Sequence, residues 1–359
     1  MSLDARAHRA AQAVRNNADR LRPPPALGVL VARRRRRAAA VNVLAVALIV
    51  AVGGVTWWRF LPTGSPQPTA TGLPRHVQAA IRVGEAPGAV AVEGSSVWVA
   101  NSGDSTVSRI DPATNKVIAT IKVGGRPTHL TAQSGALWVT TPDSMQWINP
   151  ATNQVVQTLP LPAGPGDAAV VFDGCLAVSL NDGTVRVLTP FDGRELGSVS
   201  VASRGVSALA NDRGKLWAAN GDTLVAIHDL ELKMTTRFTL QRDTNRNPQI
   251  ADLVLVEGHL WAADADGDVT RYRVDSPERT LRGQLIAREG PSAIAAGPTG
   301  VFVASHSPQT VTRFDPSTGQ AKARIHLPDV SDLAVGPDAV WATDRSRNLL
   351  YRIDPKATN

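Results

Sequence analysis

The sequence predicts an all-β protein in which one four-stranded unit recurs along most of the chain. The motif VWVANSGDSTVSRIDPATN at residues 97–115 returns in degraded copies toward the C-terminus. Gly and Pro are frequent, at 29 and 25 residues, which suits many strands joined by turns. No segment after residue 60 shows sustained helical periodicity, and this argues against an α/β enzyme.

The motif and its flanks give the four strands of the unit. Runs of β-branched and aromatic residues are separated by the turn SGDS, which is typical of a tight antiparallel hairpin. An Asp-Pro dipeptide then favours a second turn before the chain becomes extended again. The predicted strands are residues 88–92, 97–101, 106–110 and 116–123.

The spacing of the copies predicts how many units the chain holds. The centres of the second strands lie 39 to 44 residues apart, at Trp98, Trp138, Ala177, Trp217, Trp261, Phe302 and Trp341. A period near 40 residues with four strands is typical of a β-propeller. We therefore predict seven four-stranded antiparallel blades, with the recurrent Trp side chains buried in the packing between blades.

The predicted ring is closed by the N-terminal end of the domain. The seventh copy has no outer strand after it, whereas an unassigned strand, HVQAAIRV, occupies residues 76–83. This segment resembles KVIATIKV at residues 116–123, the outer strand of the first copy. We predict that residues 76–83 pair with the last blade, because closure protects sheet edges that would otherwise remain open.

The positive charge of the chain is confined to its N-terminal end. Of the formal net charge of +7, residues 1–37 contribute +8 through ten Arg and two Asp, which leaves −1 for the remainder. The predicted propeller therefore lacks the basic surface that nucleic-acid binding requires, and we expect no nucleic-acid partner.

Residues 38–58 are predicted to form one transmembrane helix. This stretch has 21 residues and no charge, enough to span a hydrocarbon core of roughly 30 Å. Five Arg precede it and one follows, which places the N-terminus in the cytoplasm. A cleaved secretory signal is the alternative, and it would export the domain as well.

The predicted organisation is therefore a protein of the cell membrane with an extracytoplasmic propeller. Its segments are a cytoplasmic basic tail at residues 1–37, the transmembrane helix at 38–58, a Pro/Thr-rich linker at 59–75 and the propeller at 76–359.

The repeat also carries a resemblance to a known family. The stretch VWVANSGDSTVSRIDPATNKVIATIKVGGRP resembles the YVTN-type β-propeller repeat, and residues 76–359 are similar to the YncE and streptogramin-lyase-like superfamily. The resemblance implies the fold more strongly than the activity, because such propellers include lyases, lactonase-like enzymes, sensors and binding surfaces. Streptogramin lyases use a His and nearby Glu residues around magnesium. No Glu-x-His pairing occurs on a predicted inner strand here, which argues against that activity.

Candidate site residues lie where the chain enters each innermost strand, around the central opening. The equivalent positions are Ala89, His129, Asp167, Ala208, Asp252, Ala293 and Asp332, with Arg126 and Arg204 on the connections between blades. Carboxylates with a nearby His are able to hold a divalent cation. The alternative is that these side chains satisfy free backbone amides and solvate a pore. The predicted ligand-binding set is Arg126, His129, Asp167, Arg204, Asp252 and Asp332, with no catalytic residue and no cofactor.

We expect a monomeric, non-catalytic binding or sensing module whose ligand is an envelope protein, a peptide or a glycan. Two alternatives remain open: a metal-dependent lyase or hydrolase of the streptogramin-lyase-like type, and a structural adaptor that uses the sides of its blades. The sequence contains no P-loop, CxxC pair, HExxH or GxSxG motif.

Overall fold

The computed structural model divides the chain into two compact units, Met1–Ser65 and Pro66–Asn359, and every residue that it describes belongs to the second. The described residues are 72–133, 135–161, 164–172, 175–189, 193–202, 205–212, 215–228, 235–242, 250–274, 278 and 280–358. The predicted cytoplasmic tail and transmembrane helix lie outside them. Within the described ranges, no helix has the length and apolar character needed to cross a membrane.

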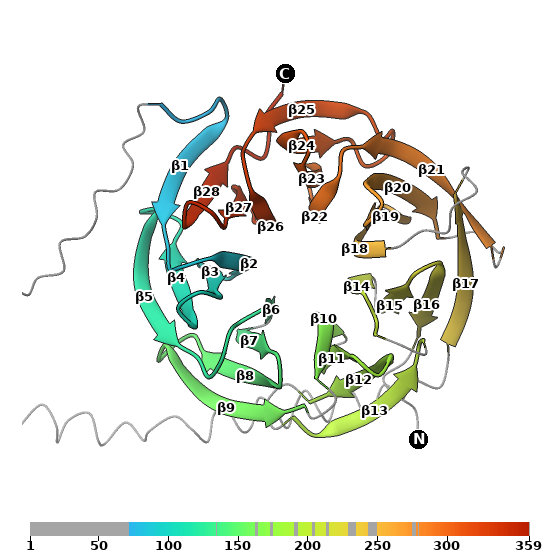
Figure 1. The fold of residues 1–359 in the computed structure, drawn as a ribbon, viewed down its shortest axis with the longest axis horizontal. Helices are drawn as coiled ribbons and strands as arrows, with labels where there is room; N and C mark the ends of the chain where they lie inside the picture. Colours follow the sequence, from blue (N-terminus) through green and yellow to red (C-terminus); the bar gives the residue numbers. More distant parts are fainter. Residues whose placement is uncertain are drawn as a thin grey trace, which may run out of the picture. The chain divides into compact units, whose positions relative to one another are not determined.

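The regular elements of this unit are β-strands, arranged in sheets around a common centre (Figure 1). Three sheets of the first half are four-stranded and antiparallel, with the strands in chain order from the inside outward. They comprise β2 (Pro87–Glu93), β3 (Ser96–Asn101), β4 (Thr106–Asp111) and β5 (Lys116–Lys122); β6 (His129–Gln133), β7 (Ala136–Thr141), β8 (Ser144–Asn149) and β9 (Gln154–Pro160); and β10 (Pro165–Phe172), β11 (Cys175–Leu180), β12 (Thr184–Leu188) and β13 (Glu195–Ser200).

The next two groups of four strands join into one eight-stranded sheet. They are β14 (Ala208–Asp212), β15 (Lys215–Asn220), β16 (Thr223–Ile227) and β17 (Thr235–Arg242), followed by β18 (Ile250–Val256), β19 (His259–Asp264), β20 (Asp268–Arg273) and β21 (Thr280–Arg288). The outer strands β17 and β21 pair in parallel, from Thr239 with Thr280 to Arg242 with Gly283. The predicted count of seven blades treats these two groups separately, and it stays a prediction.

The last two sheets contain the end of the chain and its closing strand. They comprise β22 (Pro291–Gly297), β23 (Gly300–His306), β24 (Gln309–Phe314) and β25 (Ala321–His326), and then β26 (Val330–Val335), β27 (Val340–Asp344), β28 (Leu349–Ile353) and β1 (Val77–Arg82). Strand β1 is antiparallel to β28, with Ala80 opposite Tyr351 and Ile81 opposite Leu350. The prediction that residues 76–83 close the last sheet is confirmed.

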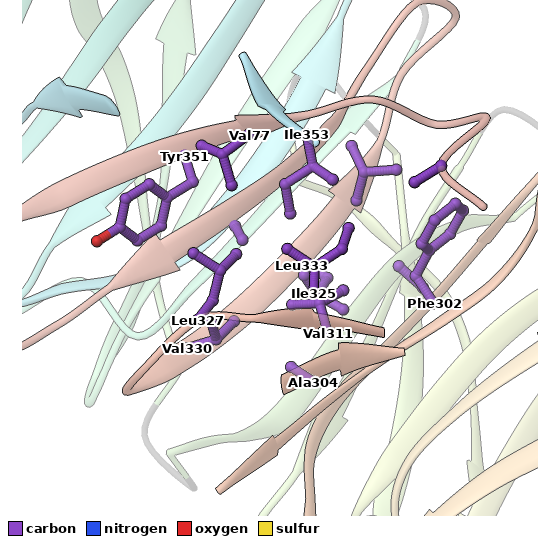
Figure 2. Close-up of a cluster of buried hydrophobic side chains, with 14 of the residues drawn as sticks. Val77, Phe302, Ala304, Val311, Ile325, Leu327, Val330, Leu333, Tyr351 and Ile353 are labelled. Atoms are coloured by element: carbon purple, nitrogen blue, oxygen red, sulfur yellow. The ribbon is translucent and has the colours of Figure 1, made fainter. Parts of the chain in front are cut away.

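The closing strand also contributes to the core between the last two sheets. Val77 lies against Tyr351 and Ile353, and the same cluster continues to Phe302 and Val311 of the preceding sheet (Figure 2). Removal of β1 would therefore expose apolar surface in addition to breaking backbone hydrogen bonds.

The recurrent Trp residues are buried, as predicted. None is more than 3% exposed, and they are Trp98, Trp138, Trp217, Trp261 and Trp341. Three of these rings are covered by an Arg of the third strand, at 4.9 Å for Arg109 over Trp98, 5.9 Å for Arg271 over Trp261 and 5.5 Å for Arg352 over Trp341. Such cation–π contacts stabilise the position of the ring in addition to the stabilisation that its burial provides.

These three Arg residues also link their own sheets to a turn of the next sheet. Arg109 Nη1 donates to Pro150 O at 2.6 Å and to Asn153 Oδ1 at 2.9 Å. Arg352 Nη1 donates in the same way to Pro112 O at 2.6 Å and to Asn115 Oδ1 at 3.1 Å. The local sequence carries no sign of these links, because each acceptor lies in a different repeat from its Arg.

Candidate functional site

A cavity of about 420 Å³ opens where the innermost strands begin, in the centre of the ring of sheets. Its walls include small side chains, among them Ala89, Ala208 and Ala293, which leave room at the point where the strands converge. Charged or titratable side chains also line it, namely His129, Asp252, Asp332 and Arg345.

Asp332 connects the last sheet to the first. Its Oδ1 accepts a hydrogen bond from its neighbour Leu333 N at 2.8 Å, and its Oδ2 accepts one from Val90 N at 2.8 Å. Val90 belongs to β2 and Asp332 to β26, so this carboxylate bridges two innermost strands that are distant in sequence.

Asp252 makes the equivalent bridge between β18 and β22. Its Oδ1 accepts from Leu253 N at 2.8 Å, and its Oδ2 accepts from Ile294 N at 3.1 Å. Both Asp residues therefore satisfy backbone amides on inner edges of the sheets, as the structural alternative in the sequence analysis expects. Since both carboxyl groups also line the cavity, they remain available to a ligand.

The environment of the cavity raises the pKa of both carboxyl groups. Burial raises the pKa of Asp252 to about 6, although hydrogen bonds from the Ile294 and Leu253 amides oppose the shift. Burial raises the pKa of Asp332 to about 7, with an additional contribution from the negative charge of Asp252. Each group therefore exchanges its proton near neutral pH, where an ordinary Asp is fully ionised.

The remaining predicted site residues lie elsewhere or outside the described residues. Arg126 is exposed, and its Nε donates to Ser102 O at 3.3 Å; it does not line the cavity. Asp167 is in β10, whose side chains the structure does not describe, and Arg204 is outside the described residues. The structure therefore brings together His129, Asp252 and Asp332 of the predicted set.

Arg345 is a cavity residue that the sequence analysis missed. It lies in the turn between β27 and β28, and its backbone N donates to Asp329 O at 3.4 Å. The available signal was the composition of that turn, RSRN, which contains two cations where the first repeat has SGDS.

No metal-binding group of three or more His, Cys, Asp or Glu side chains is present among the described residues. Asp252 and Asp332 each use both carboxylate oxygens to accept backbone amides.

Comparison with known proteins establishes the fold. No protein-family model and no curated protein matches the chain. Among solved structures, U3-55K is similar with a TM-score of 0.66 at 15% identity, covering 79% of this chain and 100% of that one. The β-propeller domain of Myceliophteria thermophila Cps50 (Swd1) has a TM-score of 0.63 at 13% identity, covering 78% and 99%. The WD40 β-propeller domain of Doa1 has a TM-score of 0.61 at 16% identity, covering 79% and 97%.

The described part of the chain is therefore a β-propeller. Identities this low carry information about the fold alone, so the YVTN-type resemblance and the membrane anchor stay predictions.

Proposed function

We propose that the chain is a membrane-anchored, seven-bladed propeller of the YVTN type that acts as a binding module. Its ligand is an envelope protein, peptide or glycan, bound extracytoplasmically on the face where the central cavity opens. The uncharged segment at residues 38–58, with the Arg block before it, supports the single-pass anchor and the orientation.

The observation that carries the proposal is that the cavity and the hairpin turns share one face. Arg345 of a hairpin turn lines the cavity, and Arg126 of an inter-sheet connection contacts Ser102 in the β3–β4 turn. Exposed carboxylates occupy four of the hairpin turns on this face, at Asp104, Asp143, Asp182 and Asp266. Polar loops held by rigid strands around a cavity are a common arrangement for ligand binding.

The bonding of the cavity carboxylates is compatible with ligand binding. One oxygen of each Asp accepts the amide of the next residue, and the other accepts an amide of an adjacent sheet. Each oxygen keeps one acceptor site for a ligand.

Site-specific photo-crosslinking of the full-length chain in its native membrane tests the binding face. A crosslinking side chain at Asp182, in a hairpin turn, should give one adduct of defined mass. The same side chain at Ala113, an exposed position in a β4–β5 turn, is the matched control and should give none. Equal adducts at both positions, or none at Asp182, would contradict the proposed face.

Thiol labelling of intact cells tests the orientation. In a Cys175→Ser background, a Cys introduced at Asp104 should react with a membrane-impermeant maleimide. A Cys at Ser2 in the tail should react only after lysis. Labelling of both sites in intact cells, or only of the tail, would refute the proposed topology.

A further inference from the structure

The cavity holds two carboxylates whose positions are fixed in advance. Asp252 and Asp332 come from different sheets, and each is oriented by two backbone amides, one from its own strand and one from a neighbouring sheet. A carboxylate oxygen has about two acceptor sites, so each oxygen can accept one more hydrogen bond. The cavity therefore presents a rigid pair of acceptors to whatever enters it.

Neither carboxylate has a cationic partner among the described residues, where the ion pairs lie elsewhere. Two partly buried carboxylates that face one cavity disfavour each other's ionisation, as the effect of Asp252 on Asp332 shows. A cation placed between them would compensate both charges. The electrostatics of the cavity thus favour a positively charged ligand.

The dimensions of the cavity favour an organic cation. Its volume of about 420 Å³ lies within the range of small-molecule sites. A primary ammonium group donates three hydrogen bonds from one compact centre, which suits acceptors that approach from two sides. The small residues Ala89, Ala208 and Ala293 line the cavity and leave room for a short carbon chain.

Arg345 adds a positive charge toward the mouth of the same cavity. Its backbone N donates to Asp329 O. Asp329 is three residues before Asp332, and three residues span about 10 Å along a strand. Within the described residues its guanidinium forms no ion pair or hydrogen bond, and it is exposed. It is therefore free to pair with an anionic group at the outer end of a ligand.

We propose that the central cavity binds a small zwitterion of the amino-acid type, with its primary ammonium group between Asp252 and Asp332 and its acid group at Arg345. This inference rests on the proposed binding function, and it adds a small-molecule ligand inside the cavity to the envelope protein, peptide or glycan bound on the same face.

Calorimetry with three probes of equal chain length tests the proposal. The full-length chain in nanodiscs is titrated at pH 8 with 4-aminobutanoate, 1-aminobutane and butanoate. The zwitterion should bind saturably at one site, and 1-aminobutane about tenfold or more weakly, since one ion-paired contact is lost. Butanoate should not bind. Absence of saturable 4-aminobutanoate binding, or equal binding of butanoate, would overturn the proposal.

Variants separate the two ends of the ligand. Asp252→Asn combined with Asp332→Asn should weaken 4-aminobutanoate binding at least a hundredfold. Arg345→Gln should reduce it to the level of 1-aminobutane. Arg82→Gln removes an exposed Arg of the outer strand β1 that does not line the cavity, and the affinity of this variant should equal that of the native chain. Native-like affinity in the double variant, or an equal loss in Arg82→Gln, would refute the assignment.

Proton linkage gives a readout on the native chain, in case the double variant fails to fold. Binding at pH 6.5, measured in two buffers of different ionisation enthalpy, should release protons because the ammonium group favours ionised Asp252 and Asp332. His129 and Arg345 are the other charged or titratable groups that line the cavity, and an ammonium ligand beside His129 would also favour proton release. Proton uptake, or no exchange, would contradict the proposal. Crosslinking at Asp182 does not depend on these probes. The proposed binding face and the proposed zwitterion ligand can therefore be refuted independently of each other.

Discussion

Two junctions between neighbouring sheets use the same side-chain chemistry, although one joins sheets that follow each other in the chain and the other joins the last sheet to the first. At the internal junction, Asp252 of β18 accepts the amide of Ile294 in β22. At the closing junction, Asp332 of β26 accepts the amide of Val90 in β2, across a sequence separation of 242 residues. The inner edges of the sheets are thus joined in the same way in both places.

The outer parts of the two junctions are also alike. Arg271 donates to Pro316 O at 3.1 Å at the internal junction, and Arg352 donates to Pro112 O at 2.6 Å at the closing one. In both cases an Arg of a third strand reaches the Pro-containing turn of the next sheet.

The closing junction has additional polar contacts. Thr343 Oγ1 donates to Gly88 O at 2.7 Å, and Ala86 N donates to Asn348 Oδ1 at 2.9 Å. Both junctions are continuous in the chain, because residues 289–290 connect β21 to β22 and residues 83–86 connect β1 of the last sheet to β2 of the first. The closing sheet differs inside, where β1 is held to β28 by strand pairing and not by a hairpin turn.

The largest expected effect is from deletion of residues 76–83 in the full-length chain. This deletion removes β1 and the fully buried Ile81, and it exposes Leu350 and Tyr351. Each large buried apolar side chain contributes about 2–5 kcal/mol, so the loss of stability should exceed about 4 kcal/mol. Thermal unfolding measures this loss. Deletion of eight residues from the linker, 61–68, is the control, and an equal effect of both deletions would contradict the closing role of β1.

The Arg contacts should give the next largest effect and distinguish the junctions. Arg352→Ala and Arg109→Ala each remove charge-assisted hydrogen bonds to a neighbouring turn, at a cost of about 2–3 kcal/mol. Arg352→Ala should in addition speed hydrogen exchange in β1 and β28, because no hairpin turn joins these two strands. Identical exchange in the two variants would contradict this difference between the closing sheet and the first sheet.

Asp332, at the closing junction, should contribute more to the pH dependence of the free energy of unfolding than Asp252 at the internal junction. Burial raises the pKa of Asp332 from 3.8 to about 7, so the native state binds the proton more tightly than the unfolded state. Its contribution is fully present below about pH 4 and is lost as the pH rises through about 7. This loss should exceed about 1.4 kcal/mol, the equivalent of one pKa unit.

Urea unfolding between pH 4.5 and 8 measures the slope of the free energy of unfolding against pH. Asp332→Asn should flatten it across the whole interval. Asp252→Asn should flatten mainly the part below about pH 6, where Asp252 itself titrates, and should also lower the pKa of Asp332 by removing a nearby negative charge. A native slope in Asp332→Asn would show that this carboxyl does not control the pH dependence.

The smallest effect is expected at the bulges of the outer strands. Gln78 in the closing strand and Ile118 in β5 occupy equivalent bulge positions and are both exposed, Ile118 at 55%. Ile118→Gln should therefore change the free energy of unfolding by no more than about 0.5 kcal/mol. A larger loss would show that this position is not equivalent in the closing and internal sheets.

The sequence by itself determined the repeated strands, the closing strand and the buried Trp series. These features depend on local signals: residues alternate along each strand, turn residues separate the strands, and the unit recurs about every 40 residues. The anchor and the count of seven blades also come from the sequence, as predictions.

The tertiary structure alone decided which polar residues meet. Asp252 and Asp332 were found as equivalent positions, but their partners, the amides of Ile294 and Val90, lie in other repeats and have no mark in the local sequence. The entry of Arg345 into the cavity, the exclusion of Arg126 and the pairing of β17 with β21 likewise depend on how neighbouring sheets are placed. Local patterns specify a strand and its faces, whereas a contact between sheets depends on the packing of the whole ring.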